Sequence, residues 1–162
     1  MILKFFDVCQ AIVFTATFPT APSEGYARKH WNNARKAISV CERVAREAQR
    51  QHVDPLLAIS VAARETRFKD VISSKGARGP LGVIPKYHCP KKGKCDYTKA
   101  GISALKKYLD LNGGEVCAAL AQYNRGNSGV CEPGRSEFEY AQDVISNYER
   151  VCSIAPYLCT NC

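Results

Sequence analysis

The sequence contains no internal repeat and no low-complexity segment, so repeat architectures and compositionally biased linkers are excluded. Its apolar N-terminal run covers only residues 8–18, which is too short to cross a bilayer as a helix. The hydrophobic fraction, 46%, is close to that of globular proteins and argues against wholesale disorder. A chain of 162 residues therefore fits one domain with a substantial core.

Acidic residues are fewer than basic ones: 15 Asp and Glu accompany 23 Lys and Arg, and the net charge is +8. The basic residues are concentrated in one predicted helix and one predicted loop, and they are Arg28, Lys29, Arg35, Lys36, Arg43, Arg46, Arg50, Lys86, Lys91, Lys92 and Lys94. A basic face attracts polyanions through long-range fields, and both nucleic acid and the acidic bacterial envelope fit that description. A solvated face without a partner is the third interpretation, and charge alone does not choose among them.

Residues 1–22 form an apolar N-terminal segment with its connector, and two interpretations of this segment are open. Lys4 precedes the apolar run, as in the core of a secretory signal or an anchor. Asp7 is unusual in such a signal, however, and no clear Ala-x-Ala cleavage site follows. An ordinary buried strand or helix is the other interpretation. We expect the main domain to cover residues 23–162 and to end in a cysteine-rich tail.

Nine cysteines in a chain of this length indicate disulfides and an oxidising compartment. Eight remain if the N-terminal segment with Cys9 is removed, and the sequence alone does not pair them. Cys89 and Cys95 flank a lysine- and glycine-rich loop and could close it as a short staple. A zinc site of these two cysteines with His88 is the rival interpretation, although the spacing fits no common zinc motif. We therefore predict no metal and no other cofactor.

Apolar residues recur at helical spacing in five segments, which are residues 26–51, 55–68, 98–111, 115–124 and 136–151. One face of the first segment is expected to be core, and it carries Trp31, Ala34, Ile38, Cys41, Ala45 and Ala48. Thr98 is expected to cap the third helix, and Ser136 with Glu139 to form a capping box at the fifth. Residues 71–86 leave room for only a small sheet. The predicted fold class is therefore mainly α.

The helix that follows Asp54 is apolar on nearly every side, which indicates burial. Asp54 can cap this helix, and Pro55 suits its first position, where a missing N–H costs nothing. Glu65 stands near its end. A carboxylate in apolar surroundings is costly to ionise, so its pKa is expected to rise, as a general acid working near neutral pH requires. In the loop that follows, residues 73–80, small side chains would let a polymer approach the backbone.

Two neighbouring stretches resemble paired motifs of one known family. Glu65-Thr66-Arg67-Phe68 resembles Glu-Ser-x-Phe. Residues 73–85 resemble Ser-x-x-Gly-Ala-x-Gly-Leu-Met-Gln with a Pro shortly after. The resemblance is incomplete, because Gly82 stands where the motif has its Gln and cannot replace the hydrogen bonds of that side chain.

Three further stretches follow in the order that the same family has. Residues 119–126 resemble Ala-Leu-Ala-Ala-Tyr-Asn-Ala-Gly, and Ile102 with Tyr108-Leu109 resembles Ile-x-x-Gly-x-x-Tyr-Leu. Residues 137–144 resemble the segment whose Tyr supports the catalytic Glu. The family is that of the soluble lytic transglycosylases, relatives of goose-type lysozyme, and the similarity extends over residues 53–151.

This resemblance implies a lysozyme-like α+β arrangement with a very small sheet. It also implies cleavage of peptidoglycan between N-acetylmuramic acid and N-acetylglucosamine. In that family the C6 hydroxyl of muramic acid attacks its own anomeric carbon, so one carboxylic acid suffices and the product has a 1,6-anhydro end. Glu65 is thereby implied as the catalytic acid/base. The implied substrate-binding residues are Thr66, Ser74, Gly79, Leu81, Tyr123, Asn124 and Tyr140.

Two alternatives stay open at this point. A goose-type lysozyme-like hydrolase, which delivers water instead, is the nearest one, and a catalytically inactive, basic wall-binding module of a phage particle or secretion apparatus is the other. The expected partners are glycan strands of peptidoglycan rather than nucleic acid, with a larger phage or secretion machine and weak association with the envelope surface in addition. The protein is expected to be a monomer on its own, in the periplasm or another extracytoplasmic space, or on a virion.

Overall fold

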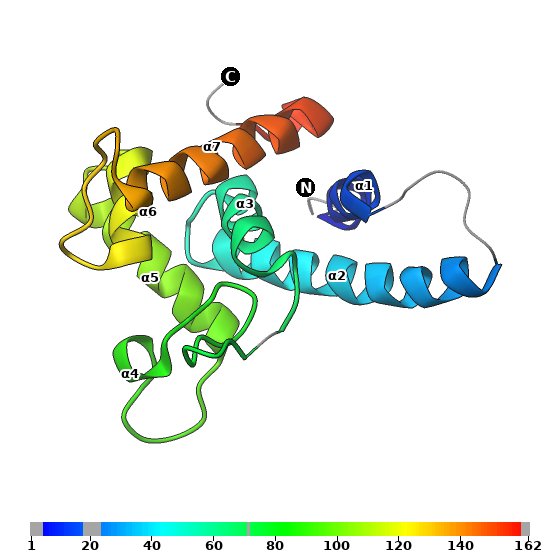
Figure 1. Cartoon of the computed structure of the whole chain (residues 1–162), viewed down its shortest axis with the longest axis horizontal. Helices are drawn as coiled ribbons and strands as arrows, with labels where there is room; N and C mark the ends of the chain where they lie inside the picture. Colours follow the sequence, from blue (N-terminus) through cyan, green and yellow to red (C-terminus); the bar gives the residue numbers. More distant parts are fainter. Residues whose placement is uncertain (1–4, 18–23, 71, 160–162) are drawn as a thin grey trace.

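In a computed structural model of the chain, residues 5–17, 24–70 and 72–159 are described. They form α1 (Phe5–Thr17), α2 (Glu24–Arg50), α3 (Pro55–Thr66), α4 (Pro85–His88), α5 (Tyr97–Leu111), α6 (Val116–Arg125), α7 (Ser136–Ile154) and a 3-10 helix, η1 (Pro156–Leu158). Extended pairing within the described residues is limited to two isolated antiparallel bridges, Ile72 with Arg78 and Arg78 with Val83. The mainly α fold class is confirmed, and the expected small sheet is reduced to these bridges (Figure 1).

α3 lies in the middle of the molecule, with α2 and α7 packed against it (Figure 1). α6 packs against α7 and α5, and α1 packs against α2 with a smaller contact to α7. The buried residues of α3 form one continuous run: Leu56, Leu57, Ala58, Ile59, Ser60, Val61 and Ala62. The prediction of a buried apolar helix is therefore confirmed. Because such a helix is held on several sides, it provides a rigid support for the residues at its end.

The N-terminal cap of α3 is also as predicted, whereas two other caps are not. The Asp54 carboxylate accepts a hydrogen bond from the backbone N–H of Leu56 at 2.8 Å. The cap of α5 lies two residues earlier than expected, because Asp96 rather than Thr98 caps the helix. The predicted capping box of Ser136 and Glu139 is wrong: Ser136 is already the first residue of α7, so its hydroxyl lies beside the Glu137 carboxylate and caps nothing.

The predicted core face of α2 is buried except at Trp31. The buried members are Ala34, Ile38, Cys41, Ala45 and Ala48. Trp31 is 41% exposed, and its ring stacks on Phe14 with the Arg35 guanidinium 5.4 Å from its centre. Trp31 is exposed because the N-terminal part of α2 extends past the other core helices, with α1 beside it (Figure 1).

Four disulfides join the described cysteines: Cys9–Cys41, Cys89–Cys95, Cys117–Cys131 and Cys152–Cys159. The predicted staple of Cys89 and Cys95 is confirmed, and these two cysteines are therefore not free to bind zinc. Cys9, which the removal of the N-terminal segment would take away, is one of the paired cysteines. The ninth cysteine, Cys162, lies outside the described residues. Four disulfides indicate an oxidising, extracytoplasmic compartment.

α1 belongs to the core in this structure. Its buried side chains are Phe5, Val8, Cys9, Ile12 and Val13, and Cys9 is bonded to α2. This agrees with the interpretation of the N-terminal segment as a buried helix. The predicted connector after it lies mostly outside the described residues. No helix in the described ranges is both long and apolar enough to cross a membrane.

Removing the Cys9–Cys41 bond is expected to destabilise the protein more than removing the Cys89–Cys95 bond. A disulfide stabilises chiefly by restricting the unfolded chain, and its effect grows with the loop that it closes. The sequence separations are 32 and 6 residues, which correspond to about 3.7 and about 2.2 kcal/mol of unfolding free energy. Urea denaturation of Cys9→Ser/Cys41→Ser and Cys89→Ser/Cys95→Ser measures the difference. Equal losses would contradict it.

Candidate active site

The chain reverses direction directly after α3, and this turn puts Glu65 at the edge of the core. Arg67 and Phe68 follow the helix with left-handed φ values of 53° and 61°, and the Arg67 N–H closes the last turn on Ala63 O at 3.2 Å. Phe68 is buried. Two consecutive non-glycine residues in this region are strained, and such strain persists where the surrounding packing imposes it.

Glu65 faces a cleft of about 480 Å³ between the end of α3, the loop before α4, and α6. The lining residues are Glu65, Thr66, Ser73, Lys75, Ala77, Gly82, Val83, Ile84, His88, Ala104, Tyr123 and Asn124. Among these described lining residues, Glu65 is the only carboxylate. The cleft therefore offers one acid, with hydroxyl, amide and amine groups around it.

The Glu65 carboxyl group has a hydrogen-bond donor at one oxygen and a close backbone neighbour at the other. The Tyr140 hydroxyl donates to Oε1 at 2.6 Å. On the other side Gly82 lies so close that a Cβ atom there would be 2.8 Å from Oε2. Because Tyr140 already donates to Oε1, Oε2 is the oxygen that carries the proton of the neutral acid.

The surroundings of Glu65 act on its pKa in opposite directions. Burial raises its pKa above the ordinary value, whereas the hydrogen bond from Tyr140 and the positive charge of Arg64 act to lower it. The net direction is upward. Glu65 therefore keeps its proton to a higher pH than an exposed glutamic acid, as the sequence predicts, while the ionised form also has a stabilising partner.

Tyr140 is itself fixed by a chain of contacts. Arg64 lies over its ring, with the guanidinium carbon 5.6 Å from the ring centre, and Arg64 Nε donates to Asp143 Oδ2 at 2.8 Å. Burial and the nearby Glu65 charge raise the pKa of Tyr140 well above its ordinary value. Tyr140 is therefore a neutral hydrogen-bond donor at all moderate pH values.

The loop that carries Gly82 is clamped by two hydroxyl groups. The Thr66 hydroxyl donates to Pro80 O at 2.8 Å, and the Tyr123 hydroxyl donates to Leu81 O at 2.5 Å. The Leu81 side chain is fully buried against Gly101 of α5, where a Cβ would be 2.6 Å from that of Leu81. These contacts fix the backbone of the loop against the carboxyl group.

The structure brings together most of the predicted site residues. Glu65, Thr66, Tyr123 and Asn124 line the cleft, and Tyr140 contacts the carboxyl group from behind. The other predicted residues do not line the cleft. Gly79 and Leu81 belong to the loop before α4 but are buried, and Ser74 is exposed to solvent away from the cleft. Ser73 takes the place expected for Ser74, and its hydroxyl accepts from Ala77 N at 3.0 Å.

Sequence reasoning missed two polar groups of the cleft, Lys75 and His88. The sequence indicates a role for His88 only as a zinc ligand together with Cys89 and Cys95. Burial and the charge of Lys107 lower the pKa of His88, so its ring is neutral near pH 7. The position of His88 directly before the disulfide of Cys89 could have indicated a site residue, because a disulfide orders the residues that flank it.

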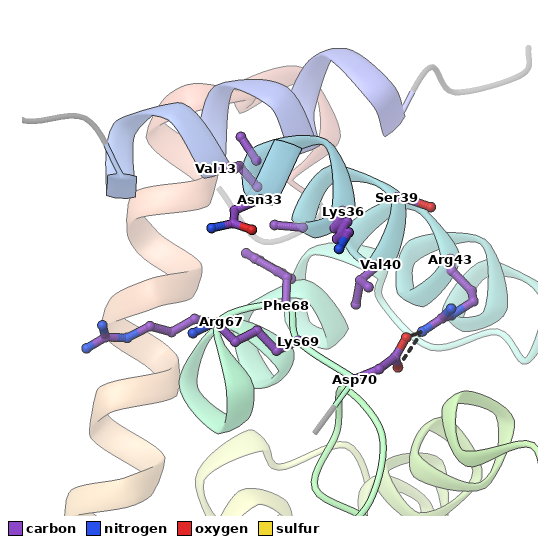
Figure 2. A pocket seen from close by; sticks show the side chains of 12 residues that line it. Val13, Asn33, Lys36, Ser39, Val40, Arg43, Arg67, Phe68, Lys69 and Asp70 are labelled. Carbon is purple, nitrogen blue, oxygen red and sulfur yellow. Dashed lines mark hydrogen bonds and ion pairs between the residues drawn. The ribbon is translucent and has the colours of Figure 1, made fainter. Parts of the chain in front are cut away.

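Asp70, the carboxylate nearest to Glu65 in the sequence, does not face the cleft. It forms an ion pair with Arg43 of α2, with Asp70 Oδ1 2.6 Å from Arg43 Nη2, and lines a different cavity on the side of α2 and α1 (Figure 2). A second catalytic carboxylate is therefore absent from the described lining of the cleft.

Replacing Tyr140 by phenylalanine is expected to raise the pKa of Glu65 further. The lost hydrogen bond favours the ionised carboxylate, so without it the neutral acid is retained to a higher pH. A carbon-13 NMR titration of the Glu65 carboxyl measures this shift. Tyr148→Phe is the matched control, since that hydroxyl on the same helix donates to Asp54 instead. An unchanged or lower Glu65 pKa in Tyr140→Phe would refute the assignment of Tyr140.

The chain matches no protein-family model, no curated protein and no solved structure. The function of the cleft is therefore inferred from its own chemistry and from the motif resemblance.

Proposed function

We propose that the protein is a lytic transglycosylase that cleaves peptidoglycan between N-acetylmuramic acid and N-acetylglucosamine. The observation that carries this proposal is Glu65: a partly buried carboxyl group with a raised pKa, bound by Tyr140, at a cleft whose described lining has no other carboxylate. A glycosidase that activates water or forms a covalent intermediate ordinarily needs two carboxylates. A single acid fits a reaction in which the substrate supplies its own nucleophile.

The reaction has two proton transfers through one residue. Glu65 first protonates the bridging glycosidic oxygen, and the bond from that oxygen to the anomeric carbon breaks. The C6 hydroxyl of the muramic acid then attacks the anomeric carbon, and the Glu65 carboxylate accepts its proton. A bond between O6 and C1 replaces the glycosidic bond, no water is consumed, and Glu65 regains its original protonation state.

The contacts of Glu65 support both halves of this cycle. Burial keeps the acid protonated until the glycosidic oxygen is in place, and Tyr140 with Arg64 stabilises the carboxylate that forms after the first transfer. An acid that later acts as a base benefits from a pKa near the operating pH. Asn124, Ser73 and Lys75 provide polar groups for the sugar and its substituents on the cleft wall.

Product analysis tests the proposal. Purified protein incubated with peptidoglycan sacculi is expected to release muropeptides with 1,6-anhydro ends, each lighter by one water molecule than the corresponding reducing-end product, as measured by mass spectrometry. Reducing ends would instead assign the protein to the goose-type lysozyme-like hydrolases. Binding without release would assign it to the inactive wall-binding modules.

The site of action is part of the same proposal. The four disulfides support an extracytoplasmic location, and we infer the periplasm or a virion as the place where such an enzyme meets peptidoglycan. A monomer that opens the wall locally, alone or as part of a phage or secretion machine, fits this role.

A further inference from the structure

A second cavity lies apart from the cleft of Glu65 and shares none of its lining residues. This cavity, which we call the α2 groove, has a volume of about 680 Å³ and lies between α2 and residues 67–70, with Val13 of α1 at its edge (Figure 2). Its size is typical of pockets for small ligands. It is not used in the reaction proposed above.

Positive charge dominates the rim of the α2 groove. Lys36 and Arg43 come from α2, and Arg67 and Lys69 from the segment after α3. The only carboxylate in its described lining, Asp70, is engaged by Arg43 through Nη2 at 2.6 and 2.7 Å. Lys36 and Lys69 are exposed and form no ion pair with any described residue. They come from two different walls, Lys36 from α2 and Lys69 from the segment after α3, and Figure 2 shows the Lys69 side chain running beside that of Arg67.

The floor of the α2 groove is apolar. Val40 and Phe68 lie between the charged walls, with Val13 at the upper side (Figure 2). Ala37 also lines the groove. A purely polar polyanion would contact only the rim. A molecule with an anionic head beside an apolar part would satisfy the lysines and also cover the floor, so it gains from both kinds of contact.

We propose that the α2 groove binds the phosphate headgroup of an anionic membrane lipid, with the adjoining apolar part of the lipid against the floor. Lys36 and Lys69 contact the phosphate, and Asn33, which lies on α2 with Lys36, offers an amide donor. The net charge of +8 attracts the whole protein toward an anionic bilayer before these contacts form. The two cavities have separate linings, so a lipid in the α2 groove would not occupy the cleft of Glu65.

Sedimentation with vesicles tests the site without relying on enzymatic activity. The full chain is expected to bind vesicles that contain phosphatidylglycerol and not vesicles of phosphatidylcholine alone. A basic residue at the membrane surface contributes about fivefold in affinity, so Lys36→Gln/Lys69→Gln should bind about 25-fold more weakly. Lys91→Gln/Lys92→Gln is the matched control, because it removes the same charge from exposed lysines of the stapled loop, and its affinity should remain near that of the native chain.

Each other outcome overturns the proposal. Equal losses in the two double variants would show a general charge effect without a groove. Absence of binding to phosphatidylglycerol vesicles would exclude the lipid, and if inorganic phosphate alone still bound by calorimetry, the ligand would be a free phosphate. Binding of an oligonucleotide lost only in Lys36→Gln/Lys69→Gln, with no vesicle binding, would assign the groove to nucleic acid. Thermal melts of both variants establish that the exposed substitutions leave the fold intact.

Discussion

Turnover of peptidoglycan is expected to fall by about a thousandfold when Glu65 is replaced by glutamine, since positioned proton transfer contributes about 10²- to 10⁴-fold. Glutamine keeps the size of the side chain and can still accept the hydrogen bond of Tyr140, but its amide group has no acidic proton to transfer to the glycosidic oxygen. The release of soluble, dye-labelled glycan from sacculi measures the rate. Asp70→Asn is the control, because that carboxylate is paired with Arg43 outside the cleft, and it should retain activity.

The same variant provides a check on the fold through its pH-dependent stability. The folded-state pKa of Glu65 is raised, so the folded chain holds this proton more tightly than the unfolded chain. The associated stabilisation is complete below about pH 4, the ordinary range of glutamic acid, and is lost as the pH rises through the raised pKa. Glu65→Gln should therefore gain stability relative to the native chain as the pH rises. A variant that is less stable at every pH would mean that the lost activity reflects damage to the fold.

Gly82→Ala is expected to lower turnover by about a hundredfold, the cost that a misplacement of about 1 Å can have in a catalytic site. The added methyl group would lie 2.8 Å from Glu65 Oε2, so the carboxyl group must move or turn. Gly76→Ala is a matched control in the same loop: its φ of +81° is as unfavourable for alanine as the +65° of Gly82, yet no atom lies within 4 Å of the new Cβ. Similar activities of the two variants would refute the role of this contact.

The contact also explains why this chain departs from the motif that it otherwise resembles. The family has a glutamine where Gly82 stands, but in this loop conformation any side chain at position 82 meets the carboxyl group. Under the proposed function, the hydrogen bonds that the glutamine would make to the sugar pass to other groups, and Lys75 and His88 are the polar cleft residues that no motif predicts. The sequence alone does not reveal this exchange, because it depends on how the loop approaches the end of α3.

Features with local causes could be predicted from the sequence. The cap at Asp54 follows from one carboxylate and one proline, and the burial of α3 from its composition. The raised pKa of Glu65 follows from that burial. The partnership with Tyr140 was predicted from the motif resemblance, and the structure has it as a hydrogen bond.

Features that depend on distant parts of the chain could not be predicted. The exposure of Trp31 depends on how far the other helices extend along α2, and the pairing of Cys9 with Cys41 depends on where α1 packs. The path of residues 72–88 has no periodicity to guide it, since it is held by single hydrogen bonds and two isolated bridges. For that reason Ser73 rather than Ser74 reaches the cleft.

The bond between Cys9 and Cys41 would hold the two parts of the chain together if the backbone between α1 and α2 were cleaved. Residues 18–23 connect α1 to α2 along the chain, and a protease that hydrolysed one peptide bond there would produce two polypeptides. They would migrate as one species on a non-reducing gel and separate only after a thiol is added. The N-terminal helix would therefore remain covalently attached to the folded protein after cleavage, as a second polypeptide.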